Sequence, residues 1–306
     1  MNAAQSAARA SGPIPLWIRA SSRVPWALFY AVAKFVTLLL HRVFRHRLDV
    51  VRSNMAGALG SLDARARAQI ETHYYRLLGE LVVETAKAAT ITPEQLRSRV
   101  HLKNLDVVRE ELDAGRSVLI VAAHQCNWEW MLLAMSLALS QPLDAAYKPL
   151  KGKHGERAMR AIRTRFGSNL VPAKELLSSI ISKRGQARAI AMVADQEPVT
   201  TDYKWWTTFL GRETAFYMGP EKIARATRFA VVFAGMRRLS RGYYEVGFEK
   251  ISAAREQFEN GTITERYARL VEREILLNPG DWIWSHRRWR LRKELESSEP
   301  TATSVG

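Results

Sequence analysis

Apolar residues along this chain fall into two patterns, short unbroken runs and longer stretches with helical spacing. Residues 118–123 and 189–194 are unbroken apolar runs, which are typical of strands buried on both faces of a sheet. The pattern also predicts helices over residues 64–89, 104–114, 157–166, 174–183, 219–228 and 263–277, strands over 143–147, 170–171, 229–236 and 243–248, and a long loop over 198–218. Because helices alternate with short apolar strands, we expect an α/β fold with a mixed, largely parallel central sheet flanked by helices.

A further apolar segment, residues 24–40, lies near the N-terminus and is interrupted by Lys34 and Thr37. As a helix it would be about 26 Å long, slightly shorter than a bilayer core of about 30 Å. A tilted membrane span, an interfacial helix and a helix packed on the domain all fit this pattern. Trp17, Trp26 and Tyr30 near its start are candidate interface anchors.

The segment divides the chain into four expected parts. These are a flexible N-terminus (1–23), a membrane-anchoring or interfacial helix (24–48), an α/β domain (49–292) and a flexible tail (293–306). Basic residues follow the apolar segment without a small-residue cleavage site, so we do not expect a cleaved signal peptide. The distribution of Lys and Arg favours a catalytic domain on the cytoplasmic side.

Composition limits the possible partners and cofactors. The chain has 306 residues and a formal net charge of +16, which suits nucleic acid, an anionic membrane surface or an acidic carrier protein. Cys126 is the one cysteine, which excludes an internal disulfide and a Cys-rich zinc site. The sequence has neither a P-loop nor a G-x-G-x-x-G motif, so we expect no nucleotide cofactor and no metal.

The residues after the first unbroken run carry candidate chemistry. His124 stands where the buried strand should end, Asn127 is placed to cap the next helix, and Glu129 lies in its first turn. A chain that folds back here would let the Glu129 carboxylate hold the His124 imidazole, whose other nitrogen could take a proton from a substrate hydroxyl. The alternative is a capping glutamate beside a hydrogen-bonded histidine at a sheet edge.

The stretch His124-Gln-Cys-Asn-Trp-Glu129 resembles the H-x4-D/E motif of glycerolipid and lipid A acyltransferases. From about Trp26 to about Trp289 the chain resembles the bacterial lipid A biosynthesis acyltransferases, the lauroyl and myristoyl transferases that act late on the Kdo-bearing precursor. Asp195-Gln196-Glu197 is similar to the family's D-Q-D/E element. The resemblance implies that Asp195 holds an arginine or orients a substrate hydroxyl, whereas a turn cap is the alternative.

Two basic segments extend the resemblance. Arg163 and Arg165 lie in a segment similar to R-x-R-F-G, where an arginine would stabilise an oxyanion or bind a sugar phosphate. Solvent-exposed arginines are the alternative in a chain this basic. Tyr147-Lys148-Pro149-Leu150 resembles Y-R-P-L, but Lys148 replaces the usual arginine and cannot bind phosphate in a bidentate manner.

The remaining motifs lie in the C-terminal half. Phe209-Leu210-Gly211 resembles the family's F-F/L-G segment and is expected to line the acyl channel, although its aromatic neighbours also suit an ordinary core. The segment 282–289 is similar to the closing W-x-H-R-R-F/W and suits either a lipid–water interface or stacking within the fold. The candidate substrate-binding residues are therefore Asn127, Tyr147, Lys148, Gln196, Phe209, Arg212, His286 and Arg287.

The resemblance implies an acyltransferase of the inner membrane. It would move a fatty acyl chain from acyl-acyl carrier protein to a hydroxyl of a lipid A precursor of the Kdo–lipid IVA type. His124 would be the base oriented by Glu129, with Arg163 or Arg165 at the oxyanion. Acceptors of another glycolipid or aminolipid class stay open. A non-catalytic protein that binds membrane or nucleic acid is disfavoured, because the basic residues spread along the whole chain. Covalent catalysis by Cys126 is a minor alternative, since the family motif does not require a cysteine.

Overall fold

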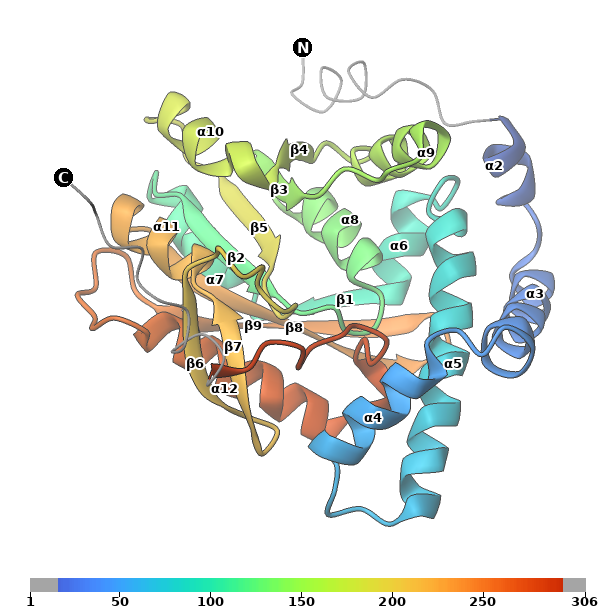
Figure 1. Ribbon diagram of the computed structural model, residues 1–306. Helices are drawn as coiled ribbons and strands as arrows, with labels where there is room; N and C mark the ends of the chain where they lie inside the picture. Colours follow the sequence, from blue (N-terminus) through green and yellow to red (C-terminus); the bar gives the residue numbers. More distant parts are fainter. Residues whose placement is uncertain (1–15, 294–306) are drawn as a thin grey trace.

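The structure, a computed structural model, describes residues 16–293 and is built on a central seven-stranded sheet (Figure 1). The strand order is β1-β9-β8-β2-β5-β3-β4. The strands are β1 (Val100–Lys103), β2 (Val118–Ala122), β3 (Leu143–Tyr147), β4 (Asn169–Pro172), β5 (Ala189–Val193), β8 (Ala230–Ser240) and β9 (Tyr243–Ser252). Neighbouring strands are parallel except for β8 and β9, which are antiparallel. The predicted mixed, largely parallel sheet is confirmed.

Helices cover both faces of this sheet (Figure 1). One face packs against α6 (Pro93–Arg99), α7 (Asp106–Asp113), α8 (Trp128–Ala138) and α9 (Lys153–Arg163). The other packs against α4 (Leu48–Ala58), α5 (Ala64–Lys87), α10 (Leu176–Ser182), α11 (Gly219–Thr227) and α12 (Thr262–Leu277). Two short 3-10 helices, η2 (Ala173–Glu175) and η3 (Pro279–Asp281), join these elements. The long predicted helices therefore lie close to their expected positions, whereas β1, α4 and α6 had no counterpart in the sequence prediction.

The central position of strand β2 in the sheet explains its unbroken apolar sequence. Val118, Ile120 and Ala122 pack on the side of α8. Leu119 and Val121 pack on the opposite side with α12. Because both faces are covered, no position in the strand favours a polar residue until the strand ends. The first ionisable side chain, His124, therefore appears at the carboxyl edge of the sheet.

Residues 198–218 are not a single loop, so that prediction is wrong. They contain a separate antiparallel pair, β6 (Lys204–Phe209) and β7 (Arg212–Tyr217). Leu210 and Gly211 connect the strands with φ values of +52° and +71°, the left-handed conformation that a tight two-residue hairpin turn requires. The side chains of β6 do not alternate between buried and exposed, which explains why the period-2 pattern is weak in the sequence.

The apolar N-terminal segment is a helix that docks on α5. Helix α3 (Trp26–Leu38) continues as a π-helical turn, η1 (Leu39–Val43), and follows the short helix α2 (Leu16–Ser21). A Cβ atom at Gly79 of α5 would lie 2.8 Å from the Ala33 carbonyl oxygen, so the backbones of α3 and α5 approach closely. The segment Trp26–Val43 is long and apolar enough to cross a membrane, and 17% of it is buried.

The outer face of α3 is apolar and exposed, with Leu28, Val32 and Phe35 about half accessible to solvent. Trp26 and Tyr30 face the domain instead: Trp26 packs edge-on against Trp130, and the Tyr30 hydroxyl donates to Glu84. Their predicted role as interface anchors is therefore wrong. Residues 16–23 of the predicted flexible N-terminus contain α2, whereas residues 1–15 and 294–306 lie outside the described residues.

Candidate active site

His124 follows β2 and meets a carboxylate that follows the neighbouring strand β5. Nδ1 of His124 is 2.7 Å from Oδ1 of Asp195, and the backbone N–H of His124 donates to Oδ2 at 3.0 Å. The indole N–H of Trp282 donates to the same Oδ2 at 2.7 Å. Because β2 and β5 are parallel and adjacent, their carboxyl ends place these residues together at one edge of the sheet.

The C-terminal segment holds this arrangement from the other side. Backbone N–H groups donate from Ile283 to the His124 carbonyl at 3.1 Å and from Cys126 to the Asp281 carbonyl at 2.8 Å. The Asp195 side chain is completely buried. Asp195 therefore orients the imidazole directly, and residues 281–283 hold Asp195 and the backbone around His124 in place.

Electrostatics assign the roles of the two nitrogens of His124. Burial alone would lower the pKa of the imidazole, but the adjacent Asp195 carboxylate outweighs burial and raises this pKa above its ordinary value. Burial would likewise raise the pKa of Asp195, yet the charge and hydrogen bonds of His124, with the Trp282 N–H, lower it. Asp195 is thus ionised and accepts the Nδ1 proton, which leaves Nε2 as the basic atom. Nε2 lies 3.4 Å from the side-chain nitrogen of Gln196.

Glu129 does not bind His124, so the prediction that its carboxylate orients the imidazole is wrong. Both of its oxygens bind Arg163, with Nε donating at 2.8 Å and Nη2 at 2.6 Å. The indole N–H of Trp128 also donates to Glu129, at 3.2 Å. The first turn of α8 directs Glu129 toward the last turn of α9, where Arg163 lies. The negative charge of Glu129 still contributes to the raised pKa of His124.

The structure separates the two candidate arginines. Arg163 is the last residue of α9, and within residues 16–293 its Nη1 has no hydrogen-bond acceptor. Arg165 lies in the turn beyond the helix, where its Nη1 donates to the carbonyls of Ala88 and Ile91. Arg165 therefore joins two structural elements, and its predicted role at the reaction centre is wrong. Asp195 binds His124 and Trp282 rather than the arginine that the resemblance implied.

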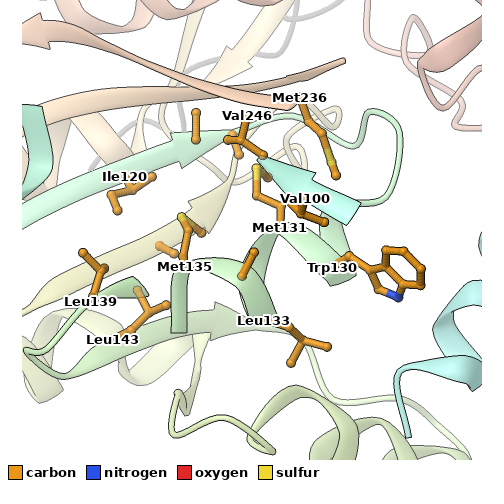
Figure 2. Packing of buried hydrophobic residues seen from close by; sticks show 14 of the residues in the cluster. Val100, Ile120, Trp130, Met131, Leu133, Met135, Leu139, Leu143, Met236 and Val246 are labelled. Atoms are coloured by element: carbon orange, nitrogen blue, oxygen red, sulfur yellow. The ribbon is translucent and has the colours of Figure 1, made fainter. Parts of the chain in front are cut away.

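An elongated cavity of about 410 Å³ opens beside His124. Its mouth is polar and aromatic, with His124, Trp128, Glu129, Tyr147, Lys148, Arg163, Gln196 and Tyr217. Between α8 and the sheet its lining is apolar and includes Ile120, Ala122, Met131, Leu132, Met135, Ala145 and Ala191; Ala146, Leu170, Met192 and Val193 also line the cavity. Figure 2 shows Ile120, Met131 and Met135 within the buried cluster whose side chains form part of the cavity wall. We call this cavity the groove.

Three of the predicted substrate-binding residues line the groove mouth, namely Tyr147, Lys148 and Gln196. Asn127 does not. Its Oδ1 accepts from the backbone N–H of Trp130 at 3.0 Å, which confirms the predicted helix cap. Its Nδ2 donates to Glu84 at 2.7 Å, and the side chain is buried. Asn127 is therefore structural, and the substrate-binding prediction for it is wrong.

The predicted acyl-channel residue Phe209 lies on the opposite face of the sheet. It is fully buried and contacts the rings of Phe216, Trp282 and Trp289. The prediction that it lines an acyl channel is wrong because the F-L-G segment forms the β6–β7 turn rather than a wall of the groove. Arg212, next in the chain, lies with its guanidinium 4.3 Å from the Trp289 ring centre and does not line the groove.

The closing aromatic segment is part of the core rather than of a lipid interface. Trp282 and Trp284 are almost completely buried. Nε2 of His286 accepts from the backbone N–H of Glu197 at 2.9 Å, and Arg287 is exposed without lining the groove. Neither His286 nor Arg287 lines the groove, and their substrate-binding roles stay predictions. The alternative that this segment stacks within the fold is correct.

Several site residues were missed by sequence reasoning. The Trp128 ring meets the His124 ring edge-to-face at 5.1 Å, and its position four residues after His124 in the motif was the available signal. Trp282 supports Asp195 from a distant segment, which only the three-dimensional fold reveals.

Cys126 is buried with its Sγ–H toward the Met236 carbonyl, and burial raises the pKa of its thiol. It is therefore unsuited to nucleophilic catalysis.

The arrangement now resembles that of an acyl-transfer site, with a carboxylate-held histidine and an arginine at the mouth of an apolar groove. The family model described as "Bacterial lipid A biosynthesis acyltransferase" matches residues 16–291. The chain belongs to this family. It is 21% identical to the "Lipid A biosynthesis palmitoleoyltransferase" of Escherichia coli (strain K12), over 94% of this chain and 92% of the relative. The "Lipid A biosynthesis acyltransferase" of Shigella flexneri matches equally.

Family membership makes this chain an acyltransferase of lipid A biosynthesis. The site geometry agrees with the family in its chemistry, because His124 and Glu129 of the H-x4-E motif both lie at the groove mouth. Within that motif the two residues belong to separate pairs, His124 with Asp195 and Glu129 with Arg163. The motif therefore contributes one residue to each of two hydrogen-bonded pairs rather than two residues to one pair.

Proposed function

We propose that this acyltransferase moves a fatty acyl chain from acyl-acyl carrier protein to a hydroxyl of a lipid A precursor of the Kdo–lipid IVA type, with His124 as the general base. One observation carries the proposal: Asp195 occupies Nδ1 of His124 at 2.7 Å, while Nε2 lies at the mouth of an apolar groove. A base beside a hydrocarbon-lined cavity suits the deprotonation of a lipid hydroxyl next to a bound acyl thioester.

The reaction would proceed by direct transfer. Nε2 of His124 takes the proton of the acceptor hydroxyl, and the oxygen attacks the thioester carbonyl. The C–S bond of the tetrahedral intermediate then breaks, and the imidazolium returns its proton to the departing thiolate. Asp195 stabilises the imidazolium between these two proton transfers. General-base assistance of this kind contributes about 10²–10⁴-fold in rate.

Arg163 is suited to stabilise the negative charge on the carbonyl oxygen. Glu129 binds its Nε and Nη2, so the guanidinium is fixed in position while Nη1 stays available. Donors that are oriented before the reaction need no rearrangement in the transition state. Removing one such donor typically costs about 10²–10³-fold in kcat.

The surroundings of the site fit the two proposed substrates. The apolar interior of the groove would hold the acyl chain, since each methylene removed from water contributes about 0.8 kcal/mol. Lys148 and Arg163 at the mouth offer cations to phosphate groups of the acceptor. The net charge of +16 favours encounter with an acidic carrier protein and an anionic membrane.

We place the enzyme at the inner membrane, with its domain on the cytoplasmic side. The exposed apolar face of α3, with Leu28, Val32 and Phe35, supports this placement. Arg42 and Arg45 follow α3 and are exposed, where they would meet anionic headgroups. Because the other face of α3 packs on α5, we favour an interfacial position for the helix over a separate membrane span.

Purified protein tests the function directly. Acyl-acyl carrier protein is incubated with a Kdo-bearing lipid A precursor, and release of free thiol and the mass of the lipid product are followed. We expect thiol release only when acceptor is present, and a loss of at least 10²-fold in His124→Ala. Wild-type activity in His124→Ala would contradict the role of the base. Transfer to an aminolipid or another glycolipid, but not to the lipid A precursor, would replace the proposed acceptor.

A further inference from the structure

The groove has an inner end that the strand register locates. Ile120 of β2, Ala191 of β5 and Ala145 of β3 are partners in one row across the sheet, and all three line the groove. The next row on the same face, toward the amino ends of the strands, is formed by Val118, Ala189 and Leu143. These three residues are buried and none of them lines the groove. The groove therefore ends between the two rows.

Helix α8 closes the same end of the groove on the side opposite the sheet. Met131 and Met135 lie one turn apart and both line the groove. Leu139, one turn further, is buried in the same cluster as Met135 and Leu143 (Figure 2) but does not line the groove. The groove therefore ends at the same depth on both walls. Met135 marks this depth on the helix, and Ala191 marks it on the sheet.

The depth of the groove is consequently finite. Ile120 precedes His124 by four residues, which corresponds to about 13 Å along an extended chain. An acyl chain whose thioester carbonyl lies beside His124 therefore meets a wall of buried side chains after a fixed number of methylenes. A longer chain would have to displace packed core residues or leave part of itself in water.

We propose that the row Ile120–Ala191–Ala145, closed by Met135, determines the length of the acyl chain that this enzyme transfers. The proposal rests on the function proposed above, since it assumes that the groove holds the acyl chain. Ala191 is the most sensitive position, because it is the middle residue of the row and its methyl group leaves space that a larger side chain would fill. Met135 is the complementary position, because its flexible side chain occupies the blind end from the helix.

The energetics of burial set the size of the effect. An acyl chain that is one methylene too long for the groove should be transferred about fourfold less efficiently than a chain that fits. In a tight pocket the loss is about tenfold or more. Ala191→Leu adds three carbons at the blind end and should exclude the last methylenes of the preferred chain. Met135→Ala removes volume there and should admit longer chains than the wild-type enzyme accepts.

A competition assay tests this. Wild-type enzyme, Ala191→Val, Ala191→Leu and Met135→Ala each receive an equal mixture of acyl-acyl carrier proteins of increasing chain length, with lipid acceptor. Mass spectrometry then gives the ratio of products. We expect the optimum to shift to shorter chains in the Ala191 variants and to longer chains in Met135→Ala, with ratios changed at least about fourfold.

Ala230→Val is the matched control. Ala230 lies on β8, where it pairs with Val118 of β2. It belongs to the same buried cluster as Ala191, but it does not line the groove. Its variant adds the same methyl groups to the core and should leave the product ratio unchanged. Thermal melting of every variant establishes that it is folded; if Ala191→Leu does not fold, Ala191→Val and Met135→Ala decide the matter.

The outcomes separate two failures. If the folded variants lose activity equally for all chain lengths, or keep the wild-type ratio, the blind-end proposal is overturned although the enzyme still transfers acyl chains. If the wild-type enzyme transfers no chain from any acyl-acyl carrier protein, the proposed function fails instead.

Discussion

Asn127 and Glu84 form a buried hydrogen bond of 2.7 Å that connects the start of α8 to the last turn of α5. The same Glu84 carboxyl group binds the hydroxyls of Tyr244 at 2.7 Å and of Tyr30 at 3.0 Å. Burial raises the pKa of Glu84 above its ordinary value, and the three donors oppose this shift by binding the carboxylate oxygens. Helix α3, the cap of α8 and strand β9 therefore meet at one carboxyl group.

Replacement of Glu84 by leucine should destabilise the fold strongly. It leaves the Asn127 amide and the Tyr244 hydroxyl buried without partners, at about 1–3 kcal/mol for each group. Glu84→Gln keeps one side-chain oxygen that can accept from these donors and should therefore cost less than the leucine variant. Urea unfolding of both variants measures the difference, and equal stability of the two would contradict this account of the network.

Asp195→Asn should shift the pH dependence of transfer. The reaction needs neutral His124, so activity falls as the pH drops through the pKa of this imidazole. Asp195 raises that pKa, which places the acidic limb of the wild-type profile above the ordinary value of about 6.5 for histidine. Without the carboxylate charge, the limb should move to lower pH while the maximal rate falls. A kcat–pH profile measures both, and an unmoved limb would mean that another group controls it.

Arg163→Lys should lower kcat by about 10²-fold or more, because lysine cannot bind Glu129 in a bidentate manner and offer a further donor. Arg165→Lys is the matched control, since Arg165 binds backbone carbonyls away from the groove. It should change stability rather than kcat. Steady-state kinetics of the two variants make the comparison; equal losses of kcat would show that Arg163 has no special role at the carbonyl oxygen.

A double substitution of Val32 and Phe35 by glutamate should release the protein from anionic lipid vesicles. Each of these side chains contributes roughly 1.5–3 kcal/mol when fully buried. Leu276→Glu with Leu277→Glu is the control, because these residues are also exposed and apolar but lie at the end of α12. Vesicle flotation compares the two pairs, and binding unaffected by the first pair would place the membrane contact elsewhere.

The sequence predicted those parts of the site that depend on local rules. The unbroken runs before His124 and Asp195 predicted two buried strands, and parallel strands bring their carboxyl ends together. Asn127 was recognised as a helix cap from its position alone. The pairing of Asp195 with His124 was not predicted, because it depends on which strand lies beside β2, and strand order is not encoded locally.

The remaining errors share one physical origin. Glu129 turns toward Arg163 because α9 packs beside α8, and Phe209 turns away from the groove because β6 and β7 form their own hairpin. Arg165 differs from Arg163 by two residues and yet faces another part of the molecule, because α9 ends between them. Family motifs identify such residues as a group, but tertiary packing decides which of them face the substrate.

The indole of Trp282 has a consequence for the biosynthesis of the enzyme. It donates to Asp195 from a segment near the end of the chain, and Ile283 beside it donates to the His124 carbonyl. While a ribosome is still translating this chain, the His124–Asp195 pair therefore lacks two of its supports. The imidazole gains both supports only after residues 282 and 283 have emerged and docked, so transfer activity should appear only once that segment has folded onto the site.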